Sequence, residues 1–181
     1  EMVIRDWSSD VCSSDLDNLY KLSYQLGKLL AEAGHTVMTG GYCGTMEAAS
    51  RGAAEAGGHT IGVTSEEIEA FRPGGPNAWV REVIPSVTLG DRIAILTRQA
   101  DAFIALPGGV GTLVEVAMSY NLIAIGAIPV RHLIVIGKGW KQTFEAFFEG
   151  QRANVNASTR AILQFAADAE SAVALLQQEK E

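Results

Sequence analysis

Apolar residues follow two alternating patterns from residue 17 to the end of the chain. In one pattern they recur every three or four positions, which predicts amphipathic helices. The first such stretch stops at Gly34, because glycine commonly terminates a helix, and Asp168 is placed to cap the last one. We predict helices over residues 19–33, 45–56, 91–99, 112–123, 140–149 and 168–179.

The second pattern is a short run of almost entirely apolar residues, which predicts a buried strand. Such runs, some ending in a glycine turn, cover residues 35–41, 60–64, 100–109, 131–137 and, as an edge strand, 161–166. Buried strands separated by helices are typical of a parallel sheet covered on both faces. The expected fold class is therefore α/β, a doubly wound Rossmann-like parallel sheet that binds ligands at the carboxyl ends of its strands.

Two segments depart from this alternation. Residues 65–86 hold three of the five prolines and predict one long irregular stretch, a candidate active-site flap. Residues 1–16, "EMVIRDWSSDVCSSDL", show neither strand nor helix periodicity and lack the apolar segment of a signal peptide. They resemble the peptide obtained by translating sequencing-adapter DNA, and we expect a non-native or disordered segment; the alternative is a genuine Ser/Asp-rich tail. We therefore expect the first strand of the fold to be missing or replaced, and residues 17–181 to form one domain.

Composition narrows the possible functions. A net charge of −7, with 14 unclustered Lys and Arg residues, argues against nucleic acid as a partner. No apolar run approaches the roughly 18 residues of a membrane helix. The cysteines, Cys12 and Cys43, are too far apart for a disulfide framework, and the three histidines are too scattered for a metal site. We expect a cytoplasmic protein without a metal.

Two glycine-rich turns at the ends of predicted strands resemble each other. They are "GGYCGTME" over residues 40–47 and "GGVGTLVE" over residues 108–115. Glycines let the backbone approach a phosphate, and the helix that follows offers free N–H groups and the positive end of its dipole. Two matched turns facing one cleft favour a nucleotide site over simple tight turns. Neither turn carries the lysine of a P-loop, and Val114 stands where the dinucleotide fingerprint needs a glycine.

The remaining candidate site residues are one acidic and one basic side chain. Glu115 lies three residues after Thr112, on the first helical turn, within reach of the sugar of a bound nucleotide. Glu47 comes only two residues after its threonine and points about 100° away from the equivalent direction. The apolar neighbours of Glu115 predict a partly buried carboxylate that needs a partner. Arg92 is the candidate partner, whereas Arg98 lies about 120° round the same helix and is expected at the surface.

The stretch "RQADAFIALPGGVGTLVEV" resembles the signature of the LONELY GUY (LOG) family, once labelled "lysine decarboxylase-like", whose hallmark is PGGxGTxxE. The hallmark is complete, and Arg92 is in register with an upstream family arginine. Two features depart from the family: Ile93 replaces the lysine that commonly follows that arginine, and "TGGYCGTME" replaces the usual GGGxxG-Leu-Met-Gly. No lysine lies in either glycine turn, which argues against pyridoxal phosphate chemistry.

The resemblance implies a phosphoribohydrolase that cleaves the N-glycosidic bond of AMP or an N6-modified AMP without a cofactor, in a pocket near a homodimer interface. Glu115 would stabilise the oxocarbenium-like sugar, and Arg92 would orient it or the ligand. The residues that would bind substrate are Gly108, Gly109, Val110, Gly111 and Thr112 for the 5′-phosphate, and Gly40, Gly41, Gly44 and Thr45 for the rest of the nucleotide. The flap around Pro73–Pro85 would set base specificity. The alternative is a non-catalytic carrier or sensor of a nucleotide or of the molybdenum cofactor.

Overall fold

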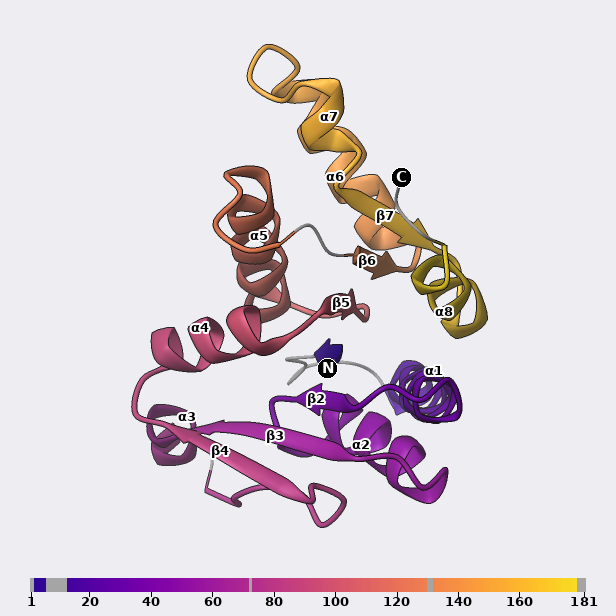
Figure 1. Cartoon of the computed structure of the whole chain (residues 1–181), viewed down its shortest axis with the longest axis vertical. Helices are drawn as coiled ribbons and strands as arrows, with labels where there is room; N and C mark the ends of the chain where they lie inside the picture. The colour runs from indigo at the N-terminus through magenta and orange to yellow at the C-terminus, as the bar shows by residue number, and fades with distance from the viewer. Residues whose placement is uncertain (1, 6–12, 72, 130–131, 179–181) are drawn as a thin grey trace.

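The computed structural model describes residues 2–5, 13–71, 73–129 and 132–178. All seven strands are parallel and form one sheet in the order β4-β3-β2-β1-β5-β6-β7 (Figure 1). The strands are β1 (Met2–Arg5), β2 (Val37–Thr39), β3 (Thr60–Ser65), β4 (Glu82–Ser86), β5 (Ala102–Ala105), β6 (His132–Ile136) and β7 (Leu163–Ala166). The predicted α/β class is confirmed, and β7 lies at a sheet edge as expected.

Helices cover both faces of the sheet. They are α1 (Ser13–Glu32), α2 (Thr45–Glu55), α3 (Glu66–Phe71), α4 (Leu89–Gln99), α5 (Val110–Ala124), α6 (Lys138–Gly150), α7 (Ala157–Arg160) and α8 (Ala169–Leu176). The buried side chains of α1, α2 and α8 share one hydrophobic cluster, and those of α4, α5 and α6 share another. Figure 1 shows α1, α2 and α8 on one side of the strands and α4 and α5 on the other.

The central strands are apolar throughout because they supply side chains to both clusters. In β6, Leu133 and Val135 pack into the cluster beneath α4, α5 and α6, whereas Ile134 and Ile136 pack into the cluster beneath α1, α2 and α8. Successive side chains of a strand point to opposite faces, so a strand covered on both sides carries no polar alternation. This is the pattern from which the sequence predicted a doubly wound sheet.

The structure corrects two sequence predictions, one about the N-terminal segment and one about residues 65–86. We expected no strand ahead of the first helix, but Met2–Arg5 forms β1 at the centre of the sheet, in register with Val37 of β2 and Ala102 of β5. Whether residues 1–16 are native in origin stays a prediction. The segment 65–86 is not one irregular stretch, because it contains α3 and the edge strand β4. An edge strand is largely exposed, so it lacks an apolar run, and it tolerates Pro85, which has no N–H.

The sheet order places a topological switch beside β1. The chain builds β2, β3 and β4 outward on one side and then returns to place β5 on the other side of β1. In this fold class, ligands bind at the carboxyl ends of the strands next to such a switch. Along the described residues, no helix is both long and apolar enough to cross a membrane.

Candidate functional site

Two loops flank the switch point at the carboxyl ends of β2 and β5. Loop 1 (residues 40–44) connects β2 to α2, and loop 2 (residues 106–109) connects β5 to α5. Only β1 separates the two strands, so they lie about 10 Å apart across the sheet. The helices that begin at the two loops pack on opposite faces. Both helix N-termini therefore border the region where a ligand of this fold is expected.

Neither of these helices has a side-chain cap. Their N-cap residues are Gly44 and Gly109, whereas side chains cap the N-termini of α4, α7 and α8, namely those of Thr88, Asn156 and Asp168. The first backbone bonds are donated by Ala48 in α2 and Leu113 in α5, which leaves the preceding N–H groups to other acceptors. These N-termini are thus able to hold an anion.

A threonine lies buried in the first turn of each helix. Thr45 and Thr112 are almost fully buried, and within the described structure neither hydroxyl has a hydrogen-bond partner. A buried hydroxyl without a partner costs about 1–3 kcal/mol, so such a group requires an explanation. A ligand oxygen that approaches the helix N-terminus would supply the missing partner.

Arg92 and Glu115 meet beside loop 2. Nη1 of Arg92 lies 3.9 Å from Oε1 of Glu115, and their side chains are 2% and 16% exposed. Arg92 comes from α4 and Glu115 from the second turn of α5, not the first turn as predicted, because the helix begins at Val110 and not at Thr112. The structure therefore brings together the two residues that the sequence singled out, while Arg98 is exposed as expected. At 3.9 Å the two groups form an ion pair, although the separation is longer than that of a hydrogen bond.

Strand β3, helix α2 and loop 1 together hold the guanidinium of Arg92 in place. Its Nε donates to the carbonyl of Val63 at 2.7 Å, Nη2 lies 3.9 Å from Sδ of Met46, and Cζ lies 5.4 Å from the centre of the Tyr42 ring. A Cβ atom at Gly40 would lie 1.7 Å from Nη2. Gly40 is therefore glycine because the arginine occupies the space of a side chain.

Burial shifts the pKa values of Arg92 and Tyr42, but both groups keep their usual charges at neutral pH. Loss of hydration lowers the pKa of Arg92 to about 10, against a small opposing effect of Tyr42, so the guanidinium is protonated at pH 7. Burial also raises the pKa of Tyr42, while its bond with the Ser65 backbone acts in the opposite direction. The ring that faces the cation is therefore a neutral phenol.

The backbone of loop 1 is already bonded by protein groups. Gly41 donates its N–H to Oγ1 of Thr39 at 3.0 Å, and its carbonyl accepts bonds from the backbone and the side chain of Asn77. The same Asn77 side chain donates to the carbonyl of Tyr42 at 3.0 Å. Of the four residues predicted here to line the nucleotide, Gly40 adjoins Arg92 and Gly41 is hydrogen-bonded within the protein, whereas Gly44 and Thr45 are the N-cap and the first residue of α2.

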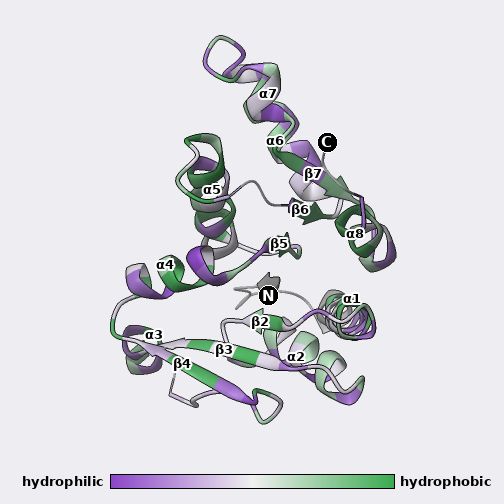
Figure 2. Ribbon diagram, viewed as in Figure 1, coloured by the Kyte–Doolittle hydropathy of each residue, from purple (hydrophilic) through white to green (hydrophobic). Residues whose placement is uncertain are grey.

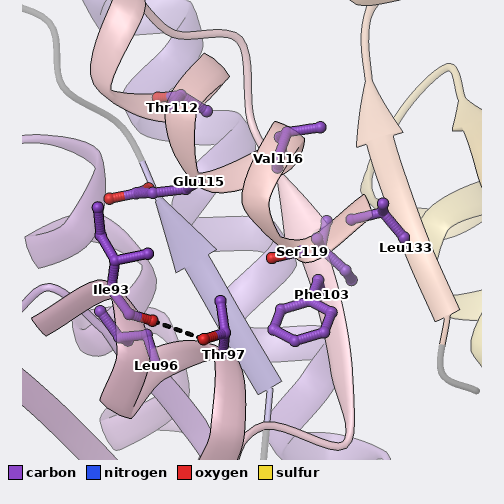
Figure 3. Close-up of a pocket in the computed structure, with 11 residues that line it drawn as sticks. Ile93, Leu96, Thr97, Phe103, Thr112, Glu115, Val116, Ser119 and Leu133 are labelled. Carbon is purple, nitrogen blue, oxygen red and sulfur yellow. Dashed lines mark hydrogen bonds between the residues drawn. The ribbon is translucent and has the colours of Figure 1, made fainter. Parts of the chain in front are cut away.

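A small pocket extends behind Glu115 between α4, α5 and the sheet (Figure 3). Glu115 points across it towards Ile93, the residue that replaces the family lysine, and Thr112 lies above it (Figure 3). Most of the other lining residues are apolar, among them Leu96, Phe103 and Val116. The volume of about 30 Å³ suffices for water but not for a purine base. A base would have to lie outside, on the solvent side of Glu115.

Sequence reasoning missed the residues that position the two loops. Trp140 of α6 donates its Nε1–H to the carbonyl of Leu106 at 2.8 Å and so fixes the start of loop 2. Tyr42 and Asn77 fix loop 1. A signal existed only for Tyr42, since an aromatic residue inside a glycine turn is unusual. Among the described residues, no cluster of three His, Cys, Asp or Glu side chains could hold a metal ion.

The model of one protein family, described as the SLOG cluster4 family, matches residues 10–160. The chain belongs to this family. It is 37% identical over 116 residues to a probable cytokinin riboside 5′-monophosphate phosphoribohydrolase of Oryza sativa subsp. japonica, covering 62% of this chain and 50% of the rice protein. It is 35% identical over 114 residues to the cytokinin riboside 5′-monophosphate phosphoribohydrolase of Mycobacterium tuberculosis, covering 61% of this chain and 60% of that protein. The predicted resemblance to LOG proteins is thus confirmed.

One solved structure superposes on nearly the whole of this chain. The molybdenum cofactor binding protein from Rippkaea orientalis superposes with a TM-score of 0.73 at 26% identity, covering 97% of this chain and 94% of that one. In contrast, the aligned regions span only about half to two thirds of the curated relatives. The proteins that this chain resembles therefore include both proteins named as hydrolases and a protein named as cofactor-binding.

Proposed function

We propose that this protein hydrolyses the N-glycosidic bond of a nucleoside 5′-monophosphate, either AMP or an N6-modified AMP. Water adds to C1′ of the ribose, the bond from C1′ to the base nitrogen breaks, and the base leaves with a proton. The products are free base and ribose 5-phosphate. The observation that carries this proposal is the convergence of Arg92 and Glu115 beside the uncapped N-terminus of α5.

Each group at this site has a task in that reaction. The N-terminus of α5, including the hydroxyl of Thr112, binds the 5′-phosphate, because it combines free N–H groups with the positive end of a helix dipole. Glu115 then lies next to the ribose, where a carboxylate stabilises positive charge developing at C1′ and accepts a proton from the attacking water. Arg92 orients Glu115 and binds a ribose or water oxygen. Gly44 and Thr45 face the nucleotide from the other side.

The working unit is proposed to be a homodimer in the cytoplasm. Helix α5 is coloured hydrophobic along most of its length (Figure 2), yet Val110, Val114 and Met118 on its outer side are 74%, 48% and 44% exposed. An apolar stripe at helical spacing next to the catalytic loop is the kind of surface that a second copy covers. The flap residues 73–85 would contribute base specificity.

A second candidate function is a carrier of a nucleotide-like ligand, such as the molybdenum cofactor. Two observations favour it: Ile93 replaces the family lysine beside Glu115, and the solved structure from Rippkaea orientalis is a molybdenum cofactor binding protein. A carrier needs the anion site at α5 but not an acid that reacts. The two candidates therefore differ in the role of Glu115.

The decisive experiment is to incubate the protein with AMP and with N6-isopentenyl AMP and to measure free base by liquid chromatography. We expect the protein not only to bind the nucleotide but also to release free base, and we expect this release to require Glu115. Base release unchanged in Glu115→Gln would contradict the catalytic role of this residue. Binding of the nucleotide without any release would favour the carrier.

A further inference from the structure

Tyr42 of loop 1 contacts both the end of β3 and Arg92, one of the two proposed catalytic residues. Its hydroxyl accepts the backbone N–H of Ser65 at 2.7 Å, and the same oxygen lies 3.2 Å from the carbonyl of Ser65 and 3.3 Å from Oε1 of Glu69. The first contact uses the hydroxyl as an acceptor, and the other two compete for its single proton. The phenol is therefore anchored at the end of β3, with its ring buried.

The face of this anchored ring is turned to Arg92. The guanidinium carbon lies 5.4 Å from the ring centre, within the range of a cation–π interaction. The carbonyl of Val63, in the same strand end, fixes Nε of the arginine at 2.7 Å. Because one end of β3 holds both the ring and the guanidinium, the arginine has one defined placement.

Residues of loop 1, of α2 and of the segment before β4 complete an enclosure around the same side chain. Gly40 provides the space for Nη2, Met46 contacts Nη2 through its sulfur, and Asn77 ties down the carbonyls of Gly41 and Tyr42. The two glycine turns look alike in sequence but differ in what they enclose. Loop 2 leads into a helix N-terminus that is open to a ligand, whereas Gly40 and Tyr42 of loop 1 adjoin an arginine.

We propose that Tyr42 is a positioning residue that holds Arg92 against Glu115, and that loop 1 is a socket for this arginine more than a second ligand loop. The kinetic consequence rests on the proposed function, but the placement of Arg92 does not. Loss of the ring removes the surface on which the guanidinium lies. Loss of the hydroxyl alone leaves that surface in place, and the ring is then still held by its burial.

The test compares three variants of the full chain. We expect Tyr42→Leu to lower kcat for AMP by about tenfold to thirtyfold, as for the loss of a desolvated cation–π contact, with KM changed less than about threefold. Tyr42→Phe retains the ring, so its kcat stays within about threefold of wild type. Tyr24→Leu is the matched control, because Tyr24 faces Arg51 in a similar contact of 5.8 Å on the surface of α1 and α2, and its kcat is expected to equal that of wild type.

A second readout does not depend on catalysis. The Nε–H of Arg92 donates to Val63 in a buried position, so it should give a slowly exchanging resonance in the arginine region of a ¹H–¹⁵N spectrum, assigned by its loss in Arg92→Lys. We expect this resonance to shift or broaden in Tyr42→Leu and to persist in Tyr42→Phe and Tyr24→Leu. If Tyr42→Leu does not fold, Asn77→Ala loosens the same loop and is expected to perturb the same resonance.

The outcomes separate the two proposals. An unchanged Arg92 resonance in Tyr42→Leu, together with kcat within twofold of wild type, overturns the socket. An unperturbed resonance in Asn77→Ala overturns it where Tyr42→Leu does not fold. Absence of base release from AMP by the wild-type protein contradicts the proposed hydrolase, and the spectrum then decides the socket by itself.

Discussion

Nη1 of Arg92 lies 3.9 Å from Oε1 of Glu115, although 23 positions of chain and the whole of β5 separate the two residues. The arginine is almost fully buried, and its remaining contacts are with the carbonyl of Val63, the sulfur of Met46 and the ring of Tyr42. A buried charge of this kind is stable only if its neighbours compensate it. Glu115 is the carboxylate found beside it, so the two side chains should behave as one unit.

This coupling predicts non-additive effects on catalysis. Glu115→Gln removes the charge that faces the ribose, and we expect kcat to fall about 10²-fold to 10⁴-fold, with nucleotide affinity retained. Arg92→Lys shortens the reach and loses the fixed donor fork, and we expect a loss of about tenfold to hundredfold. In the double variant the losses should not multiply, because residues acting as a unit are removed together. Multiplicative losses in steady-state kinetics would show that the two act independently.

Gly40→Ala tests the space occupied by the arginine. The new Cβ would lie 1.7 Å from Nη2 of Arg92, so the guanidinium must move away from Glu115. We expect kcat to fall at least about tenfold and stability to fall by roughly 1–3 kcal/mol, as for overpacking. Gly139→Ala in α6 is the control, because nothing lies within 4 Å of its Cβ position. Equal behaviour of the two alanine variants in activity and thermal unfolding would refute the assignment.

Thr112→Val tests the phosphate site. The substitution keeps the shape of the side chain and removes a buried hydroxyl that has no partner within the described protein. A hydrogen bond to a charged group contributes about 1.5–3 kcal/mol, so the inhibition constant of ribose 5-phosphate should rise about tenfold to hundredfold. Inhibition by adenine, which carries no phosphate, should stay the same. Thr143→Val on the exposed side of α6 is the control, and a parallel rise for adenine would argue against a phosphate contact.

The exposed apolar stripe of α5 predicts an interface. A charge at Met118, which is 44% exposed, would be buried without a partner in a dimer. We expect Met118→Glu to give a monomer in light scattering coupled to gel filtration, while wild type elutes as a dimer. Phe71→Glu is the control. It replaces a more exposed apolar residue on another helix, α3, and should leave the dimer intact. A monomeric wild-type protein would contradict the proposed interface.

The ionisation of the socket predicts a flat response to pH near neutrality. Burial lowers the pKa of Arg92 to about 10, so the folded and unfolded states both carry the proton below about pH 9. Above about pH 10 the unfolded state binds more protons than the folded state, and the contribution of Arg92 to stability then rises with pH. Burial raises the pKa of Tyr42, which gives a contribution of opposite sign. Wild type and Tyr42→Phe should therefore show the same shape of the kcat/KM profile between pH 6 and 9, and a limb lost in Tyr42→Phe would contradict this.

Much of the candidate site could be predicted because it depends on local spacing. Thr112 and Glu115 are three residues apart on one helix, so a helical turn alone places both at the start of α5. The doubly wound class followed from apolar runs separated by helical periods, since every covered strand must be apolar on both faces. Asp168 was also predictable, because a capping residue acts on the next turn of its own chain and is seen to cap α8.

Other features depended on contacts that no local pattern records. The strand Met2–Arg5 lacks a distinctive sequence signal and exists because β2 and β5 pair with it on both sides. Strand β4 is exposed at the edge of the sheet, where an apolar run is not required. Arg92 approaches Met46 across 46 positions of chain, and Trp140 bonds Leu106 across 34. The layers of the fold, the glycine loops and the acid could therefore be predicted, because they follow from the periods of helix and strand. The contact between one glycine loop and an arginine could not, because it depends on groups that folding brings together from loop 1, α2, β3 and α5.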